Sequence, residues 1–276
     1  AEASRALGVH EGVPVGPGAV DQPAGALGLG LSPGDLLYSL GTSGVVMTSC
    51  SRPVHDASGW VNGVADAAGG YLPLVCTLNA TKVTDTVARL LGVDHDGLAD
   101  LALAASRTAG RPVLAAYFDG ERSPDRPRAT GALVGLTNET SREEVALAAV
   151  EGVLLGLVRG QHALASAGAA VDGEVAVVGG GARSLAYRQV LADLVGQPVV
   201  RRDAPEATAR GAAVQAAAVL AGEPIDLVAR RWRPPVIDVT DPRDRGADIW
   251  ERYVRTAGWA GLDRDPEPSK DEGGRR

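Results

Sequence analysis

The chain is poor in the residues that build disulfide frameworks and metal sites. Its 276 residues include two cysteines, Cys50 and Cys76, and four histidines. Two thiols fit a reduced, cytoplasmic protein better than a secreted disulfide scaffold, which needs many cysteines. The histidines show no metal-ligand spacing, so we expect no metal ligands in this chain.

Positive charge is also scarce, with 27 Lys and Arg against 34 Asp and Glu, a formal net charge of −7. Nucleic acids and anionic membranes bind concentrated Lys and Arg, so neither is an expected partner. No apolar run approaches the length of a membrane span, and no signal peptide is visible.

Two catalytic signatures are missing as well. The chain has no G-x-S-x-G elbow, which argues against a Ser-His-Asp hydrolase. Its glycine-bounded segment Gly41-Thr42-Ser43-Gly44 carries no lysine, so it does not match the P-loop pattern.

What is present is an alternation of helical and strand-like patterns, with 36 glycines to form turns. This alternation favours an α/β fold with ample material for a core. Strands are expected at 9–16, 36–40, 45–48, 112–118, within 174–184 and at 198–201. Helices are expected at 81–91, around 98–105, and at 143–168, 185–195 and 206–221. Ser141 and Glu144 match a capping box at the start of the longest helix.

The segment Gly41–Gly44 joins two predicted strands and has two interpretations. Glycines let backbone amides turn toward an anion and the two hydroxyls add donors, which would make a phosphate cradle. An ordinary hairpin turn uses the same residue types. Taken alone, the segment favours the hairpin turn.

A second glycine segment, Gly179-Gly180-Gly181, lies between a predicted strand and a predicted helix. Amides and a helix N-terminus there favour a phosphate group. One candidate ligand is a dinucleotide, because Gly179, Gly181 and Ser184 approximate G-x-G-x-x-G and Asp203 follows about 20 residues on. The other candidate is an adenine nucleotide. A tight turn without a ligand is the third interpretation.

Asp21 is the single acid in the stretch PVGPGAVDQPAGALGLG, directly before or at the start of a predicted helix. An N-cap role would explain it, and taken alone this is the preferred interpretation. Its small neighbours also leave room for a substrate hydroxyl, as a general base requires. Glu121 and Arg122 lie in a charged, proline-broken loop at 119–131. They could pair with each other or touch the substrate, but we expect them to be solvated.

Read in order, several segments together closely resemble the carboxyl-terminal half of the FGGY carbohydrate kinases. They are GPGAVDQPAGALGLGL, SLGTSGVV, YFDGERSPDRPRATGALVGLT, VVGGGARSLAYRQVLADLVGQPV and EATARGAAVQAA. The GERSP…ATGALVGL part is most similar to the xylulokinase branch. The resemblance runs from about Val13 to about Leu262 and implies a ribonuclease H-like (actin-like ATPase) fold, with MgATP between two domains.

The resemblance also implies roles for individual residues. Asp21 matches the catalytic base that deprotonates the sugar hydroxyl attacking the γ-phosphate. The residues expected near ATP are Gly41, Thr42, Ser43, Gly44, Asn79, Gly180, Gly181, Ala182 and Ser184. ATP and Mg²⁺ are the expected cofactors, with the metal ligands mostly outside this chain.

The implied function is ATP-dependent phosphorylation of D-xylulose to D-xylulose 5-phosphate in pentose catabolism. The sequence leaves open whether the protein forms a homodimer. Two other functions stay open: a family kinase for glycerol, ribulose or gluconate, and a dinucleotide-binding oxidoreductase domain. A non-catalytic fragment that only folds is a third hypothesis.

The chain departs from the family pattern in two ways. Val20 stands where the family usually has glycine, directly before the base. No D-x-G-T stretch occurs, and Met47 is the only methionine, so we expect an amino-terminal domain to be missing and the isolated chain to be inactive. The expected domains are 1–31 as the remnant of that domain, 32–222 as the nucleotide-binding domain, 223–262 as an extension with a helix, and 263–276 as a disordered tail.

Overall fold

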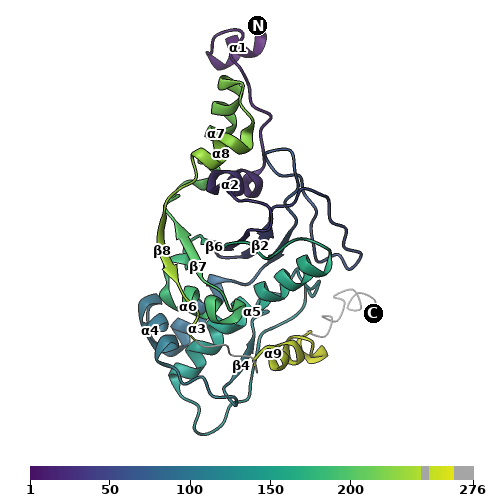
Figure 1. The fold of residues 1–276 in the computed structure, drawn as a ribbon. Coiled ribbons are helices and arrows are strands. Elements are labelled where there is room, and N and C mark those ends of the chain that lie inside the picture. Colours follow the sequence, from purple (N-terminus) through teal and green to yellow (C-terminus); the bar gives the residue numbers. More distant parts are fainter. Residues whose placement is uncertain (244–248, 264–276) are drawn as a thin grey trace, which may run out of the picture.

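The computed structural model describes residues 1–243 and 249–263 (Figure 1). Its centre is a six-stranded sheet in the order β3-β2-β1-β6-β7-β8. The strands are β1 (Leu36–Leu40), β2 (Gly44–Thr48), β3 (Leu74–Thr77), β6 (Val175–Val178), β7 (Val199–Arg202) and β8 (Val236–Thr240). β1, β6 and β7 run parallel, whereas β2, β3 and β8 are antiparallel to their neighbours. The carboxyl ends of β1 and β6 therefore lie at the same edge of the sheet.

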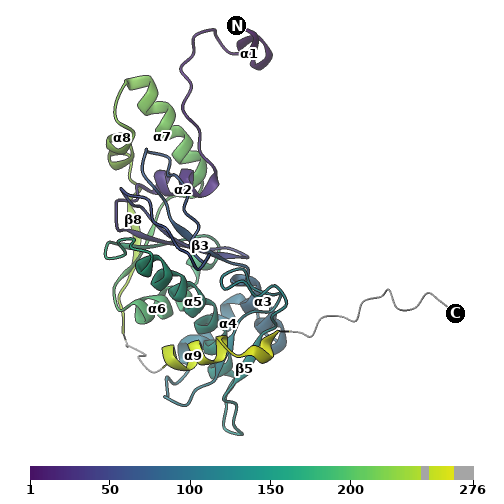
Figure 2. The same cartoon turned by 90° about the vertical axis from the view of Figure 1, so that its right-hand side faces the viewer.

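Helices cover both faces of this sheet, whereas α1 (Glu2–Leu7) lies away from it (Figures 1 and 2). The other helices are α2 (Asp21–Leu29), α3 (Thr81–Leu91), α4 (His95–Ala104), α5 (Arg142–Ser166), α6 (Leu185–Val195), α7 (Ala207–Ala221), α8 (Ile225–Arg231) and α9 (Ile249–Ala257). Helices α3 to α6 share the core on one face, and α2 with the start of α7 packs on the other. A small sheet of β4 (Val113–Ala115) and β5 (Ala132–Val134) packs with α9.

Strand side chains alternate between the two cores, as the period of a β-strand requires. On β1, Leu36, Tyr38 and Leu40 face the layer of α5, whereas Leu37 faces α2. Because both faces are covered, the strand is almost wholly apolar. This explains why Ser39 is the one small polar residue in its sequence.

Helices α2 and α7 cross with their backbones in close contact. A β-carbon on Gly28 would lie 2.0 Å from the carbonyl oxygen of Ala207, and one on Gly211 would lie 1.9 Å from that of Ala24. Only glycine fits these two positions, since no side-chain carbon approaches a carbonyl oxygen so closely. The crossing fixes the start of α2, which carries Asp21, against the rest of the chain.

Several predicted elements are confirmed. The helices at 81–91 and 185–195 have the predicted bounds, and the hairpin of β1 and β2 is present. The capping box is formed: Ser141 Oγ accepts from Glu144 N at 3.2 Å, and Glu144 Oε2 accepts from Ser141 N at 3.1 Å. The helix that it opens ends at Ser166, two residues earlier than predicted.

Two strand predictions are wrong. Residues 9–16 form no strand, and Pro14 and Pro17 supply no amide donors for a ladder there. This segment runs away from the sheet toward α1 (Figure 1). The strand predicted at 112–118 is reduced to Val113–Ala115, because the partner strand β5 offers only three residues. The predicted tail lies, except for Asp263, outside the described residues.

Candidate nucleotide site

Two glycine segments leave the sheet side by side. β1 and β6 are parallel neighbours, with Ser39 opposite Val178, so the segments that follow them begin at the same edge. Gly179 has φ +91°, in the region that favours glycine. The Gly41–Gly44 loop and the Gly179–Gly181 turn, which are far apart in the sequence, are therefore brought together, with Gly179 and Gly181 against Leu40.

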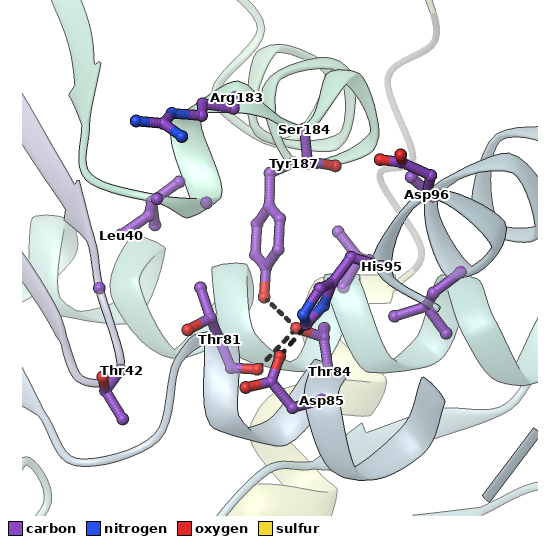
Figure 3. Close-up of a pocket in the computed structure, with 16 residues that line it drawn as sticks. Leu40, Thr42, Thr81, Thr84, Asp85, His95, Asp96, Arg183, Ser184 and Tyr187 are labelled. Atoms are coloured by element: carbon purple, nitrogen blue, oxygen red, sulfur yellow. Dashed lines mark hydrogen bonds and ion pairs between the residues drawn. The ribbon is translucent and has the colours of Figure 1, made fainter. Parts of the chain in front are cut away.

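A pocket of about 520 Å³ opens where these segments meet the helices on the α5 side of the sheet (Figure 3). It is lined by Leu40, Gly41, Thr42, Thr81, Thr84, Asp85, His95, Asp96, Leu98, Ala99, Val150, Gly180, Gly181, Arg183, Ser184 and Tyr187. Of the residues expected near ATP, the lining includes Gly41, Thr42, Gly180, Gly181 and Ser184. Ser43, Gly44, Asn79 and Ala182 do not line it.

Helices α3, α4 and α6 supply most of the pocket residues that the sequence did not reveal. The hydroxyls of Thr84 and Tyr187 are 3.0 Å apart and hydrogen-bonded, and Thr84 also donates to the carbonyl of Thr81 at 2.8 Å. Burial raises the pKa of Tyr187 well above its usual value, so its hydroxyl stays protonated. His95 Nδ1 lies 3.3 Å from Asp85 Oδ1 on the exposed side (Figure 3). These residues belong to no motif, and their spacing only indicated helices.

The Gly41–Thr42 segment is tied to the start of α3 by backbone hydrogen bonds. The amide of Ala80 donates to the carbonyl of Thr42 at 3.1 Å, and the amide of Thr81 donates to that of Gly41 at 3.0 Å. Both carbonyl groups are therefore occupied by α3. The shape of the loop thus depends on where α3 begins.

Asn79, directly before these two residues, is buried and held by its side-chain amide. Its Nδ2 donates to the Gly120 carbonyl at 2.7 Å and to Glu121 Oε2 at 3.0 Å. Its Oδ1 is buried and has no hydrogen-bond partner within the described part of the chain. An acceptor in that condition is available to a ligand or water donor.

Glu121 is not solvated, so the sequence-based interpretation of this residue is wrong. It is 2% exposed, and its carboxylate accepts from the amides of Leu78 and Arg122, each at 2.7 Å. Burial raises the pKa of Glu121, while its hydrogen bonds, that from Asn79 first, oppose the shift. The loop's polar composition gave no sign that this one acid folds inward. Arg122 is exposed, as expected.

Asp21 is the first residue of α2, so its predicted place at a helix start is confirmed. The N-cap interpretation is wrong: Val20 is the N-cap and makes no side-chain cap hydrogen bond. The Asp21 carboxylate is exposed and, among the residues that the structure describes, accepts only from the neighbouring Gln22 amide, at 2.8 Å. The helix dipole stabilises an acidic side chain in the first turn even when that side chain does not cap the helix.

Asp21 does not line the pocket, but its charge acts on Cys76, near the end of β3 that borders the Gly41–Gly44 loop. Cys76, a free thiol on β3, stands opposite Val45, the residue after Gly44. The pKa of this thiol is raised mainly by burial; Arg122 lowers it, and the carboxylates of Asp21 and Glu121 raise it further. Asp21 is thus close to β3, on the α2 side of the sheet, whereas the pocket opens on the α5 side.

The described residues contain neither a metal cluster nor a helix that could span a membrane. Within residues 1–243 and 249–263, no three His, Cys, Asp or Glu side chains gather in a way that could hold a metal ion. Over the same ranges, every helix is too short or too polar to cross a bilayer.

Comparison with known proteins identifies relatives of the chain. The profile of the C-terminal domain of the FGGY family of carbohydrate kinases matches residues 36–220. The xylulose kinase of Streptomyces coelicolor is 40% identical over 238 residues, which cover 85% of this chain and 48% of the relative. That of Streptomyces rubiginosus is 38% identical over 251 residues, covering 91% and 50%. The chain spans about half the length of the curated relatives it matches.

Solved structures give the same result. The crystal structure of xylulose kinase from Bifidobacterium adolescentis superposes with a TM-score of 0.78 at 39% identity, over 88% of this chain and 47% of that one. This likeness confirms the predicted ribonuclease H-like (actin-like ATPase) fold class. It also removes the dinucleotide-binding oxidoreductase alternative. The chain belongs to the FGGY family of carbohydrate kinases.

Proposed function

We propose that the chain is the nucleotide-binding, carboxyl-terminal half of an ATP-dependent kinase that phosphorylates D-xylulose to D-xylulose 5-phosphate. Relatives named xylulose kinase, 38 and 40% identical, support this substrate. The observation that carries the proposal is the pocket, in which Gly41, Thr42, Gly180 and Gly181 meet at the carboxyl edge of two parallel strands. Backbone amides at such an edge suit a nucleotide phosphate.

The pocket divides into a polar and an apolar part that fit the two parts of ATP. Amides and hydroxyls of the two glycine segments would hold the phosphates. The base would lie between the apolar side chains of α4 and the buried ring of Tyr187. Gly180 has ordinary helical angles and no atom within 4 Å of the place of a β-carbon, so it leaves the pocket open.

Asp21 would act as the general base. Its exposed carboxylate would take the proton from the sugar hydroxyl as that oxygen attacks the γ-phosphate. Phosphoryl transfer needs mainly positioning and charge neutralisation, so one base beside amide-rich loops is sufficient on this side. The effect of the Asp21 charge on the pKa of Cys76, which pairs with the residue after Gly44, supports this arrangement.

Magnesium, which the family resemblance implies, has no fitting ligand cluster among the described residues. The domain limits 1–31, 32–222 and 223–262 are part of the proposal, supported by the family match over 36–220. The cytoplasmic location and the homodimer stay predictions.

The nucleotide part is tested by thermal shift of the 276-residue chain with ATP, ADP and NAD. We expect stabilisation by ATP and ADP. Stabilisation by NAD alone would end the kinase proposal.

Catalysis is tested in a chimera in which this chain replaces the matching half of the Streptomyces coelicolor xylulose kinase. We expect ATP-dependent phosphorylation of D-xylulose, lost in D21A while ATP still binds. Undiminished turnover in D21A would show that Asp21 is not the general base. A preference for glycerol or gluconate would contradict D-xylulose as the substrate.

A further inference from the structure

The buried carboxylate of Glu121 links two segments of the chain. One oxygen accepts from the backbone amides of Leu78 and Arg122, each at 2.7 Å. The other accepts from Asn79 Nδ2 at 3.0 Å. Leu78 and Asn79 directly follow β3, so the 119–131 loop is fastened to the segment between β3 and α3.

That segment in turn holds the phosphate-facing loop. Two residues beyond Leu78, the amide of Ala80 donates to Thr42 O at 3.1 Å, and that of Thr81 donates to Gly41 O at 3.0 Å. A continuous series of short contacts therefore runs from Glu121 to Gly41 and Thr42. These two residues line the pocket, whereas Glu121 does not.

Stability alone does not account for an acid at this position. Removing a carboxylate from water costs free energy, which its hydrogen bonds only offset. A glutamine would keep the size but present an NH₂ group where at least one donor now points, because only an ionised carboxylate accepts at both oxygens. An ionised carboxylate at position 121 is therefore needed to accept from all three donors, Leu78 N, Asn79 Nδ2 and Arg122 N.

A second connection between the same two segments offers a control. Lys82 Nζ of α3 lies 2.9 Å from Asp119 Oδ2. The side chains are 30% and 70% exposed, so this ion pair is on the surface and contributes little. It lies two residues from Glu121 and touches neither Leu78 nor Asn79.

We propose that Glu121 is a positioning residue for the nucleotide phosphates. By fixing Leu78 and Asn79, it sets where α3 begins and so holds Gly41 and Thr42 in the shape that presents their amides to the phosphates. The proposal rests on the proposed function, because it takes the pocket to bind ATP.

The proposal predicts a selective loss of affinity. E121Q weakens ATP and ADP binding about tenfold, the loss expected for one charge-assisted hydrogen bond. Adenosine binding is unchanged, because α4 and α6 form that part of the pocket without contact to Glu121. A role in folding alone would lower the affinity for all three ligands equally.

The test measures ATP, ADP and adenosine affinity of the 276-residue chain by calorimetry, for wild type, E121Q and the control D119N. Hydrogen exchange on the ligand-free proteins follows the amides of Gly41–Ser43 and Leu78–Thr81. Faster exchange there in E121Q alone, with the selective loss of ATP and ADP affinity, supports the proposal. If E121Q does not fold, E121D, whose shorter carboxylate does not reach all three donors, takes its place.

Three results would overturn it: equal losses for ATP and adenosine, no loss at all, or the same loss in D119N. Should wild type bind no nucleotide, the proposed function fails. The exchange measurement then still decides whether Glu121 holds the loop, and unchanged exchange in E121Q refutes that.

Discussion

Gly179 lies with its α-carbon against the main chain of Leu40, and a β-carbon at position 179 would stand 2.6 Å from the Leu40 carbonyl oxygen. This contact joins the two glycine segments of the pocket. G179A is expected to lower the free energy of unfolding by about 2 kcal/mol or more, through the clash and the φ of +91°. Urea denaturation measures it, and a loss below about 0.5 kcal/mol would contradict the close contact.

The neighbouring Gly180 gives the matched comparison. It has φ −60° and ψ −43°, and nothing lies within 4 Å of its β-carbon position. G180A is therefore expected to fold with wild-type stability. Its methyl group enters the pocket and weakens ATP binding, as calorimetry would show. Unchanged affinity would mean that ATP does not approach this turn.

The crossing of α2 and α7 makes a second pair of glycine variants informative. G28A places its methyl group 2.0 Å from the Ala207 carbonyl oxygen and should destabilise the chain by about 2 kcal/mol or more. G25A on the same helix meets only Thr208 Oγ1, at 3.6 Å, and should gain up to about 1 kcal/mol from helix propensity. Equal effects of the two variants in urea denaturation would refute the crossing.

The pH dependence of stability should reflect Glu121. Burial raises its pKa above the usual value near 4.5, so the folded state binds its proton more readily than the unfolded state. The stability it contributes is complete below about pH 4.5 and is lost as the pH rises through the higher folded-state value. The difference in unfolding free energy between wild type and E121Q should therefore shift against wild type across that range. A shift in the opposite direction would show that hydrogen bonding outweighs burial.

A buried ion pair beside the small sheet gives a fourth prediction. Arg111 Nη2 lies 3.0 Å from Glu151 Oε1, and the two side chains are only 2% and 4% exposed. R111M alone should cost about 3–5 kcal/mol, because it leaves a buried charge without this partner. The double variant R111M/E151L should recover most of that loss. A double variant as unstable as the sum of both single variants would show that the pair is not coupled.

Local patterns were sufficient for much of the fold. The helices at 81–91 and 185–195 and the capping box at Ser141 followed from periodicity and end signals, which depend on residues close in sequence. The two glycine segments were also visible in the sequence, the second because three consecutive glycines exceed what a turn needs.

Tertiary structure decided what those segments do together. Parallel pairing of β1 with β6 brought Gly41 next to Gly180, although about 140 residues separate them. Tertiary structure also buries Glu121, although the composition of its loop predicts an exposed side chain. The donors that hold its carboxylate, Leu78 N and Asn79 Nδ2, come from the segment after β3. Local sequence determines backbone conformation over a few residues. Burial depends on which distant segment packs against a side chain, and that information is not local.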